Sequence, residues 1–186
     1  MPNSVTRLAT YDDLLDLPDH IVGEIISGVL ISHPRPAPRH ALAASALGST
    51  IFDRYDRNSP DGPGGWWIID EPECHLGNDV LVPGIAGWRQ STLSELPTLA
   101  WFDVAPDWVC KIISPSTHKH DRSTKRDIYA REGIAHYWIV DPVEQLMEVF
   151  ALLDGQWTLA GTAKDLDVIA LAPFEEFQID LGRIWA

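Results

Sequence analysis

The stretch that decides the fold is APDWVCKIISPSTHKHDRSTKRDIYAREGIAHYWIVDP, from Ala105 to Pro142. It contains an apolar run over 108–113, a charged segment over 121–132 with the pattern of a helix, and a second apolar run over 137–140. A strand–helix–strand unit of this size is typical of a parallel strand pair joined by a right-handed crossover. Ligands of such sheets bind where the strands end, so the turn over 114–120 is the expected place for chemistry.

Apolar runs and turn signals elsewhere predict more strands and helices around this unit. Helices are expected over 11–17 and, in an alanine-rich segment, over 40–55. One hairpin is expected over 21–31, with a turn at Ser27-Gly28, and a second over 66–88, with a turn at Gly77-Asn78. A third is expected over 147–160, with a turn at Asp154-Gly155. A short strand is expected over 177–181. The sequence therefore predicts one α/β domain over residues 1–186, with a mixed, curved sheet flanked by helices.

Composition places the chain among ordinary globular proteins. It has 186 residues, of which 45% are hydrophobic and 22% charged, enough for one domain with a proper core. No apolar run reaches membrane-spanning length, and the first residues lack a signal-peptide pattern. Cys74 and Cys110 lie in apolar runs, so we expect two buried thiols, with a disulfide as the alternative. These features favour a cytoplasmic protein with no membrane partner.

The charge distribution bears on whether the protein approaches nucleic acid. A net charge of −13 opposes the approach of phosphates. Residues 111–131, however, carry six Lys or Arg against two acids, which makes this segment +4 in a chain that is otherwise −17. The basic cluster is either a solvated helix face or an edge that faces phosphate.

Short motifs in a fixed order along nearly the whole chain resemble one protein family. They are Glu24 with Gly28 in a Glu-x-x-x-Gly hairpin, Pro34 to His40, Glu71-Pro72-Glu73, Val82-Pro83, Pro106-Asp107, Ser114 to Thr117, Asp121-Arg122 with Lys125, and Tyr137-Trp138 through Asp141-Pro142. The chain thus resembles the Uma-two family of putative restriction endonucleases, a bacterial branch of the PD-(D/E)XK nuclease superfamily. The resemblance implies a restriction-endonuclease-like fold, DNA as substrate, and Mg²⁺ or Mn²⁺ as the family's cofactor.

Two positions depart from the pattern of this family. Gly84 follows Pro83 where the family usually has aspartate, and Lys111 stands where it usually has glutamate. In the superfamily these two carboxylates hold the metal that activates water for phosphodiester cleavage. An ammonium at the place of a cation would repel it by about 4 kcal/mol at about 4 Å and an effective dielectric of about 20. We therefore expect no metal in this chain.

The resemblance also implies roles for two residues that do match the family. Glu24 is a residue near the metal site or an ordinary edge-strand charge. Lys125 corresponds to a lysine on the crossover helix, which would stabilise charge on phosphate; the alternative is a solvated helix lysine. Lys111 needs a counter-charge if it is buried, so we expect it to pair with Glu24 or Glu73.

Several other residues are weaker candidates. His40 is a cap, a packing residue or a phosphate contact. Glu73, which we expect to share a strand face with Glu71, is a possible replacement for a lost ligand. Candidate nucleic-acid contacts are Lys119, Arg122 and Arg126.

Three functional hypotheses follow from these residues. The first is a catalytically degenerate member of the family, the second an active Mg²⁺- or Mn²⁺-dependent nuclease whose ligands have migrated, and the third a non-enzymatic module that binds nucleic acid or protein. Apolar and aromatic residues late in the chain also need cover, which favours a homodimer.

Overall fold

The computed structural model describes residues 7–33, 36–113 and 121–185. The strands are β1 (Val22–Ile26), β2 (Val29–His33), β3 (Trp66–Asp70), β4 (Cys74–Leu76), β5 (Asp79–Leu81), β6 (Ile85–Arg89), β7 (Trp108–Ile112), β8 (His136–Asp141), β9 (Leu146–Leu153), β10 (Gln156–Lys164), β11 (Val168–Ile169) and β12 (Ile179–Asp180). The helices are α1 (Tyr11–Leu15), α2 (Pro38–Tyr55), α4 (Thr124–Arg131) and a 3-10 helix over Leu181–Arg183.

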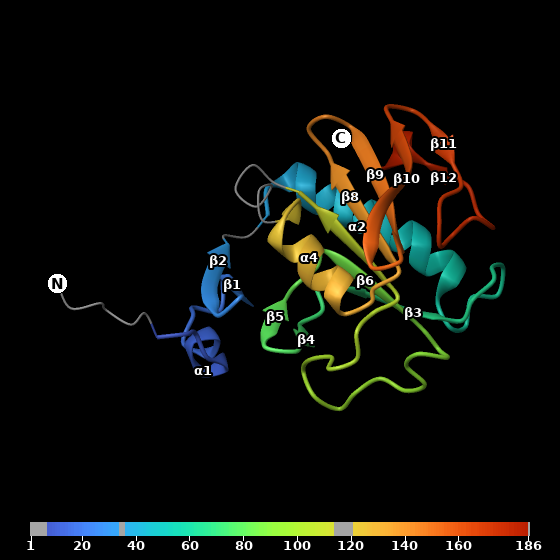
Figure 1. Ribbon diagram of the computed structural model, residues 1–186. Coiled ribbons are helices and arrows are strands. Elements are labelled where there is room, and N and C mark those ends of the chain that lie inside the picture. The colour runs from blue at the N-terminus through green and yellow to red at the C-terminus, as the bar shows by residue number, and fades with distance from the viewer. Residues whose placement is uncertain (1–6, 34–35, 114–120, 186) are drawn as a thin grey trace.

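The centre of the fold is a six-stranded mixed sheet in the order β10-β9-β8-β7-β6-β3 (Figure 1). Strands β7 and β8 pair in parallel, with Trp108 opposite His136, and α4 lies between them in the chain. The other neighbouring strands in this sheet pair antiparallel. The mixed α/β architecture and the parallel pair predicted from the sequence are therefore confirmed.

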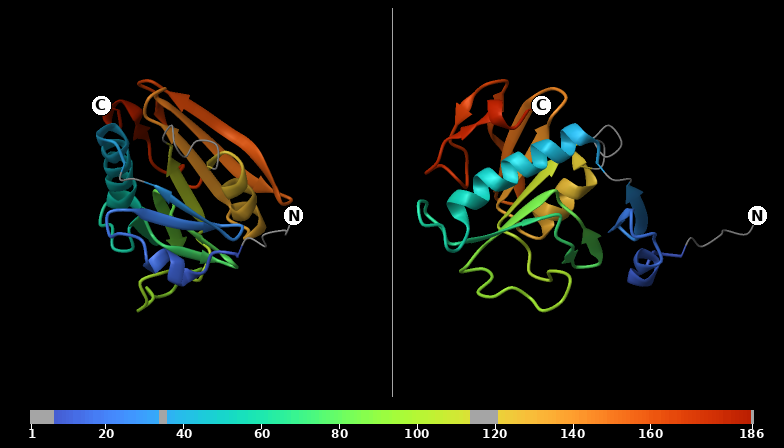
Figure 2. Two further views of the ribbon diagram at one scale, coloured as in Figure 1. Left: turned by 90° about the vertical axis from the view of Figure 1, so that its left-hand side faces the viewer. Right: turned by 180° about the vertical axis from the view of Figure 1, so that it is seen from behind.

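The two faces of this sheet carry separate hydrophobic cores, because successive strand residues point to opposite faces. On β7, Trp108 and Cys110 pack into the core that contains Leu47 and Ile51 of α2. Val109 faces the other core, which contains Ile128 of α4. Figure 2 shows α2 and α4 on opposite sides of the sheet. Lys111 has the parity of Val109, so the strand directs it toward the α4 side.

A smaller antiparallel sheet, in the order β2-β1-β5-β4, lies beside the large one on the α4 side. Both hairpins in it have the predicted turns: Gly28 and Gly77 adopt positive φ at their tips, which glycine does without steric cost. In the β9–β10 hairpin, Gly155 plays the same part.

The runs over 66–76 and 80–88 are each divided between two strands in two sheets, so the expectation of one continuous hairpin over 66–88 is wrong. The backbone leaves the large sheet at Glu71, whose φ of +45° is unusual for a non-glycine residue, and Pro72 lacks an N–H for a strand ladder. The Glu71 N–H donates to Gly84 O at 3.0 Å. Glu71 and Glu73 consequently lie in a turn and do not share a strand face.

Other features agree with the sequence or differ from it in extent. Cys74 and Cys110 are free and buried, as expected. Helix α1 ends before 17, α2 begins at Pro38, and α4 begins at Thr124, after the expected residue 121. Across the described ranges, no helix has the length and apolar character needed to cross a bilayer.

Candidate functional site

The candidate site lies on the α4 side of the large sheet, where β1, β7 and α4 meet. Glu24 comes from β1 and Lys125 from α4, and both are fully buried. Lys111 comes from β7 and is partly buried. Three segments far apart in the sequence thus bring one carboxylate and two ammonium groups into one region.

Both carboxylate oxygens of Glu24 are occupied by protein donors. Oε2 accepts a hydrogen bond from Lys125 Nζ at 2.6 Å and lies 3.0 Å from His33 Nε2. Oε1 accepts the Val82 N–H at 2.8 Å. Burial alone would raise the pKa of Glu24, but the His33 hydrogen bond and the charges of Lys125 and Lys111 outweigh it and hold the pKa at about 2.

Lys125 joins Glu24 to a second buried carboxylate, Asp121. The Asp121 Oδ1 atom lies 3.0 Å from Lys125 Nζ, and Asp121 is fully buried. Burial alone would lower the pKa of Lys125, but the two carboxylates outweigh it and raise the pKa. No role of its own was expected for Asp121. Its spacing of four residues before a lysine was the available signal, because such pairs face each other on a helix.

Lys111 does not make the ion pair expected for it. Its Nζ donates to the carbonyl oxygen of Val82 at 3.2 Å, and no acid in the described ranges lies within ion-pair distance. Burial lowers the pKa of Lys111 and the Lys125 ammonium lowers it further, while Glu24 acts in the opposite direction. Pairing with Glu24 or Glu73 was the wrong expectation, because the Glu24 carboxylate already accepts from Lys125 and from the Val82 N–H, and the Glu73 carboxylate contacts Tyr11 and His75 instead.

Gly84 lies beside Lys111, as the alignment with the family predicts. Ile85 pairs with Cys110 in the antiparallel β6–β7 ladder, so Gly84 faces Lys111. A Cβ atom at Gly84 would meet Ile112 Cδ1 at 3.1 Å and Cys110 O at 3.4 Å. The two departures from the family pattern are therefore neighbours in space, next to Val82 and Glu24.

The weaker candidates lie in different surroundings. His40, near the start of α2, hydrogen-bonds through Nε2 to Ile112 O at 2.7 Å, and burial lowers its pKa. This contact ties α2 to the end of β7. The Glu73 carboxylate accepts from Tyr11 Oη at 2.8 Å and lies 2.8 Å from His75 Nε2, in contacts that include neither Lys111 nor Lys125.

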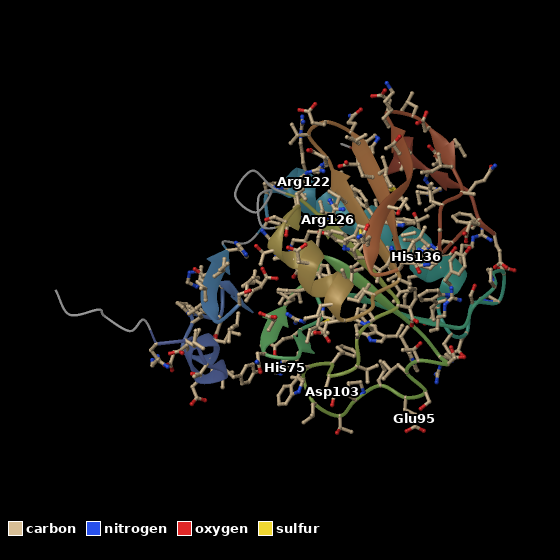
Figure 3. All side chains as sticks on the ribbon, viewed as in Figure 1. His75, Glu95, Asp103, Arg122, Arg126 and His136 are labelled. Atoms are coloured by element: carbon tan, nitrogen blue, oxygen red, sulfur yellow. The ribbon has the colours of Figure 1, made fainter. Side chains whose placement is uncertain are left out.

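The described arginines of the basic cluster have partners within the protein. Arg122 pairs with Glu148, and the Arg126 guanidinium lies 4.4 Å from the centroid of the Phe150 ring. Arg126 lies on α4 and Arg122 just before its start, beside the strands of the large sheet (Figure 3). Arg131 pairs with Asp79 at 2.9 Å. Lys119, the third candidate for nucleic-acid binding, lies outside the described residues.

Comparisons with known proteins bear on the family and the fold of the chain. The family model of Uma2, "Putative restriction endonuclease", matches residues 8–182. The chain belongs to the Uma2 family. Its fold is similar to the crystal structure of a putative nuclease belonging to DUF820 from Anabaena variabilis, with a TM-score of 0.76 and 22% identity over 95% of this chain and 97% of that one. None of the curated proteins matches the chain.

The residues of this Uma2 chain do not fit the divalent metal that a restriction-endonuclease-like family implies. Gly84 offers no side chain, and Lys111 offers a donor where a ligand needs a lone pair. Glu24 is held by Lys125, His33 and Val82. Within the described ranges, no three His, Cys, Asp or Glu side chains are grouped so that they could hold an ion.

The pKa of Glu24 gives a prediction for the pH dependence of stability. A carboxyl group with a pKa of about 2, against an ordinary value of 4.5, stabilises the fold above pH 4.5, and this stabilisation is lost as pH falls toward 2. We expect the difference in unfolding free energy between the unmodified chain and Glu24→Gln to shrink by about 1–2 kcal/mol from about pH 5 to about pH 3.

Urea unfolding of both proteins at several pH values measures this difference. A difference that stays constant across the range would show that Glu24 does not titrate with a lowered pKa. The exposed pair partner Asp53, changed to Asn, serves as the control, because its side chain is 81% exposed.

Proposed function

We propose that this Uma2 protein is a catalytically degenerate member of its family, which keeps the restriction-endonuclease-like fold but does not cleave DNA with a divalent metal. The observation that carries the proposal is the state of Glu24. Its carboxylate is fully buried, and Lys125, His33 and the Val82 N–H take up both of its oxygens. In the family, the glutamate at this position would lie near the metal. In this chain, Glu24 is instead bonded to donors of the protein itself.

The charges around Glu24 support the same conclusion. Lys111 and Lys125 bring two amino groups to a site that lacks the family's aspartate and glutamate. Removal of two carboxylates lowers the affinity for Mg²⁺, because this ion depends on one or two of them together with water and phosphate. Addition of an ammonium raises the repulsion of any cation. Both substitutions therefore act in the same direction.

An active nuclease with migrated ligands is the second candidate. Asp121 favours it, because this buried carboxylate lies near Glu24 and belongs to neither of the lost positions. The Lys125 ammonium, however, lies within 3.0 Å of carboxylate oxygens of both acids. A metal could bind between Glu24 and Asp121 only after the Lys125 side chain moved away. The buried Lys125 ammonium would then need a new counter-charge or access to water.

A non-enzymatic binding module is the third candidate, and the +4 segment over 111–131 is its support. Three of its members are used internally, since Lys125, Arg122 and Arg131 pair with Glu24, Glu148 and Asp79. We propose a cytoplasmic location, which the two free buried thiols support because a reducing compartment keeps thiols reduced.

A plasmid assay tests the proposed loss of cleavage. Supercoiled plasmid incubated with the purified protein and millimolar Mg²⁺ or Mn²⁺ is expected to remain as intact as in a parallel reaction with EDTA. Nicking that follows the protein through a second purification step, and that EDTA abolishes, would support the migrated-ligand nuclease instead.

Binding of DNA is measured separately by fluorescence anisotropy. We expect the affinity for a short duplex to be no tighter than about 10⁻⁵ M at about 150 mM salt, in the range of non-specific binding. Submicromolar binding without cleavage, weakened by Arg126→Ala, would favour the binding module.

A further inference from the structure

A cavity lies between helix α1 and the turn that joins β3 to β4. Its volume is about 330 Å³, and Tyr11 of α1, Val22 of β1 and Glu71 of the turn are among the residues that line it. Figure 1 shows α1 at the margin of the molecule. The cavity is distinct from the ion cluster described above, because neither Glu24 nor Lys125 lines it.

One wall of the cavity is apolar and has no cover. Leu14 and Leu15 of α1 and Leu17 beyond its end line this wall, and α1 buries none of its residues. Leu15 is 65% exposed. The wall is held in place by close packing on β1, since a Cβ atom at Gly23 would meet Leu17 Cδ1 at 2.4 Å and Leu14 Cδ2 at 2.6 Å. Contiguous apolar surface of this kind marks interaction sites.

The charged residues that line the cavity, among those the structure describes, are all acids: Asp19, Glu71 and Glu73. The Glu71 carboxylate is exposed and makes no hydrogen bond or ion pair with another described residue. Glu73 contacts both Tyr11 Oη and His75 Nε2 at 2.8 Å through one oxygen, Oε1. Carboxylate oxygens therefore remain open to a ligand, beside an apolar wall.

We propose that this cavity binds a lysine or arginine side chain of a protein partner. These side chains place their methylene stems along apolar surface while the charged end stays near water or an acid. The stem would lie against the leucines, and the cation would reach the carboxylates of Glu71 and Glu73. Hydrogen bonds between a cation and a carboxylate are about twice as strong as those between neutral groups.

Charge and apolar surface together favour a basic segment of another protein over other partners. The net charge of −13 attracts cations and repels the phosphates of nucleic acid. A second copy of the chain would bring the same charge, so the homodimer expected from the sequence does not account for this cavity. The exposed Leu15 offers a contact to an apolar neighbour of the inserted side chain, and a free polyamine has no such group.

NMR titration of the ¹⁵N-labelled protein tests the proposal, with the peptide Ala-Leu-Lys-Leu-Ala as the probe. We expect saturable shifts at the amides of Tyr11, Glu71 and Glu73, with a Kd on the order of 10⁻⁴ M at about 150 mM salt. The same peptide with an acetylated lysine, which has lost its charge, is expected to bind at least about 10-fold more weakly.

Two variants separate the cavity from the general negative charge of the protein. Glu71→Gln removes one carboxylate from the cavity and is expected to weaken peptide binding by about 10-fold. Glu144→Gln removes one exposed carboxylate from the turn between β8 and β9, outside the cavity, and is expected to change the Kd by less than about 2-fold. Both side chains are exposed, so both variants should keep the thermal midpoint of the unmodified chain.

Spermidine, titrated in the same way, distinguishes a protein partner from a polyamine and is expected to bind at least about 10-fold more weakly than the peptide. Equal binding of spermidine, equal losses in Glu71→Gln and Glu144→Gln, or no saturable shift at millimolar peptide would overturn the proposal. All titrations contain EDTA, and the cavity takes no part in cleavage. A negative result therefore leaves the proposed loss of cleavage untouched, and a nuclease activity found in the plasmid assay would leave this site untouched.

Discussion

Lys125→Met is expected to lower the free energy of unfolding by about 3–5 kcal/mol. The variant keeps most of the side-chain volume but removes the ammonium that lies 2.6 Å from Glu24 and 3.0 Å from Asp121. Both carboxylates are fully buried, so neither can regain its solvation in water. The loss of one partner from a buried ion pair costs far more than the loss of a surface pair, because it leaves an uncompensated charge.

Thermal and urea unfolding measure the effect. A loss of this size corresponds to about 6–20 °C in the thermal midpoint for a chain of this length. Arg39→Met, which removes a cation from an exposed position on α2, is expected to change stability by no more than about 0.5 kcal/mol. If Lys125→Met were destabilised by less than about 1 kcal/mol, the ion cluster would not be holding α4 against β1.

A double variant separates lost charge from lost packing. Glu24→Gln with Lys125→Met removes opposite charges from one pair, and it is expected to be less destabilised than the sum of the two single changes. Additive losses would mean that the pair contributes nothing beyond the separate side chains.

The second large effect is expected from Gly84→Asp combined with Lys111→Glu. This double variant returns both carboxylates to neighbouring positions, one immediately before β6 and one on β7, and removes the repulsive ammonium. An aspartate at Gly84 would approach Ile112 Cδ1, the mobile end of a side chain, so a small shift can accommodate it. With Mn²⁺ at about 100 times its Kd, stability should rise by about 2.7 kcal/mol, which is about 5–10 °C in the thermal midpoint.

The single variants and a neutral pair are the controls for this experiment. Gly84→Asp alone should not respond to metal, because Lys111 still repels the ion, and Lys111→Glu alone should bind weakly. Gly84→Asn with Lys111→Gln has nearly the same volume and no new charge, so it should not respond. An equal response by the neutral pair, or none by the charged pair, would show that these positions do not form a metal site.

The core of the fold was predictable because its signals are local. The apolar runs on β7 and β8 and the charged segment between them determine a parallel pair, and this is what the structure has. The break at Glu71 was not predictable from the same signal. The run over 66–76 looks continuous, and only the pairing of β3 with β6 but of β4 with β5 shows that the chain changes sheets.

The candidate site shows where sequence reasoning ends. The positions of Gly84 and Lys111 followed from motif order, and they are neighbours in space. The partner of Lys111 did not follow, because two lysines compete for one carboxylate and the geometry of α4 gives it to Lys125. The burial of Asp121 could not be predicted either, because an acid and a lysine four residues apart on a helix usually form a solvent-exposed pair.

The most direct test of the central claim is a metal titration of the unmodified chain. Its thermal midpoint is measured with increasing Mg²⁺ and Mn²⁺ up to about 10 mM, beside the Gly84→Asp, Lys111→Glu double variant. A ligand that binds only the native state must raise stability. We expect a midpoint for the unmodified chain that does not move while that of the double variant rises. A saturable rise in the unmodified chain that Glu24→Gln abolishes would contradict the claim that this site has lost its divalent metal.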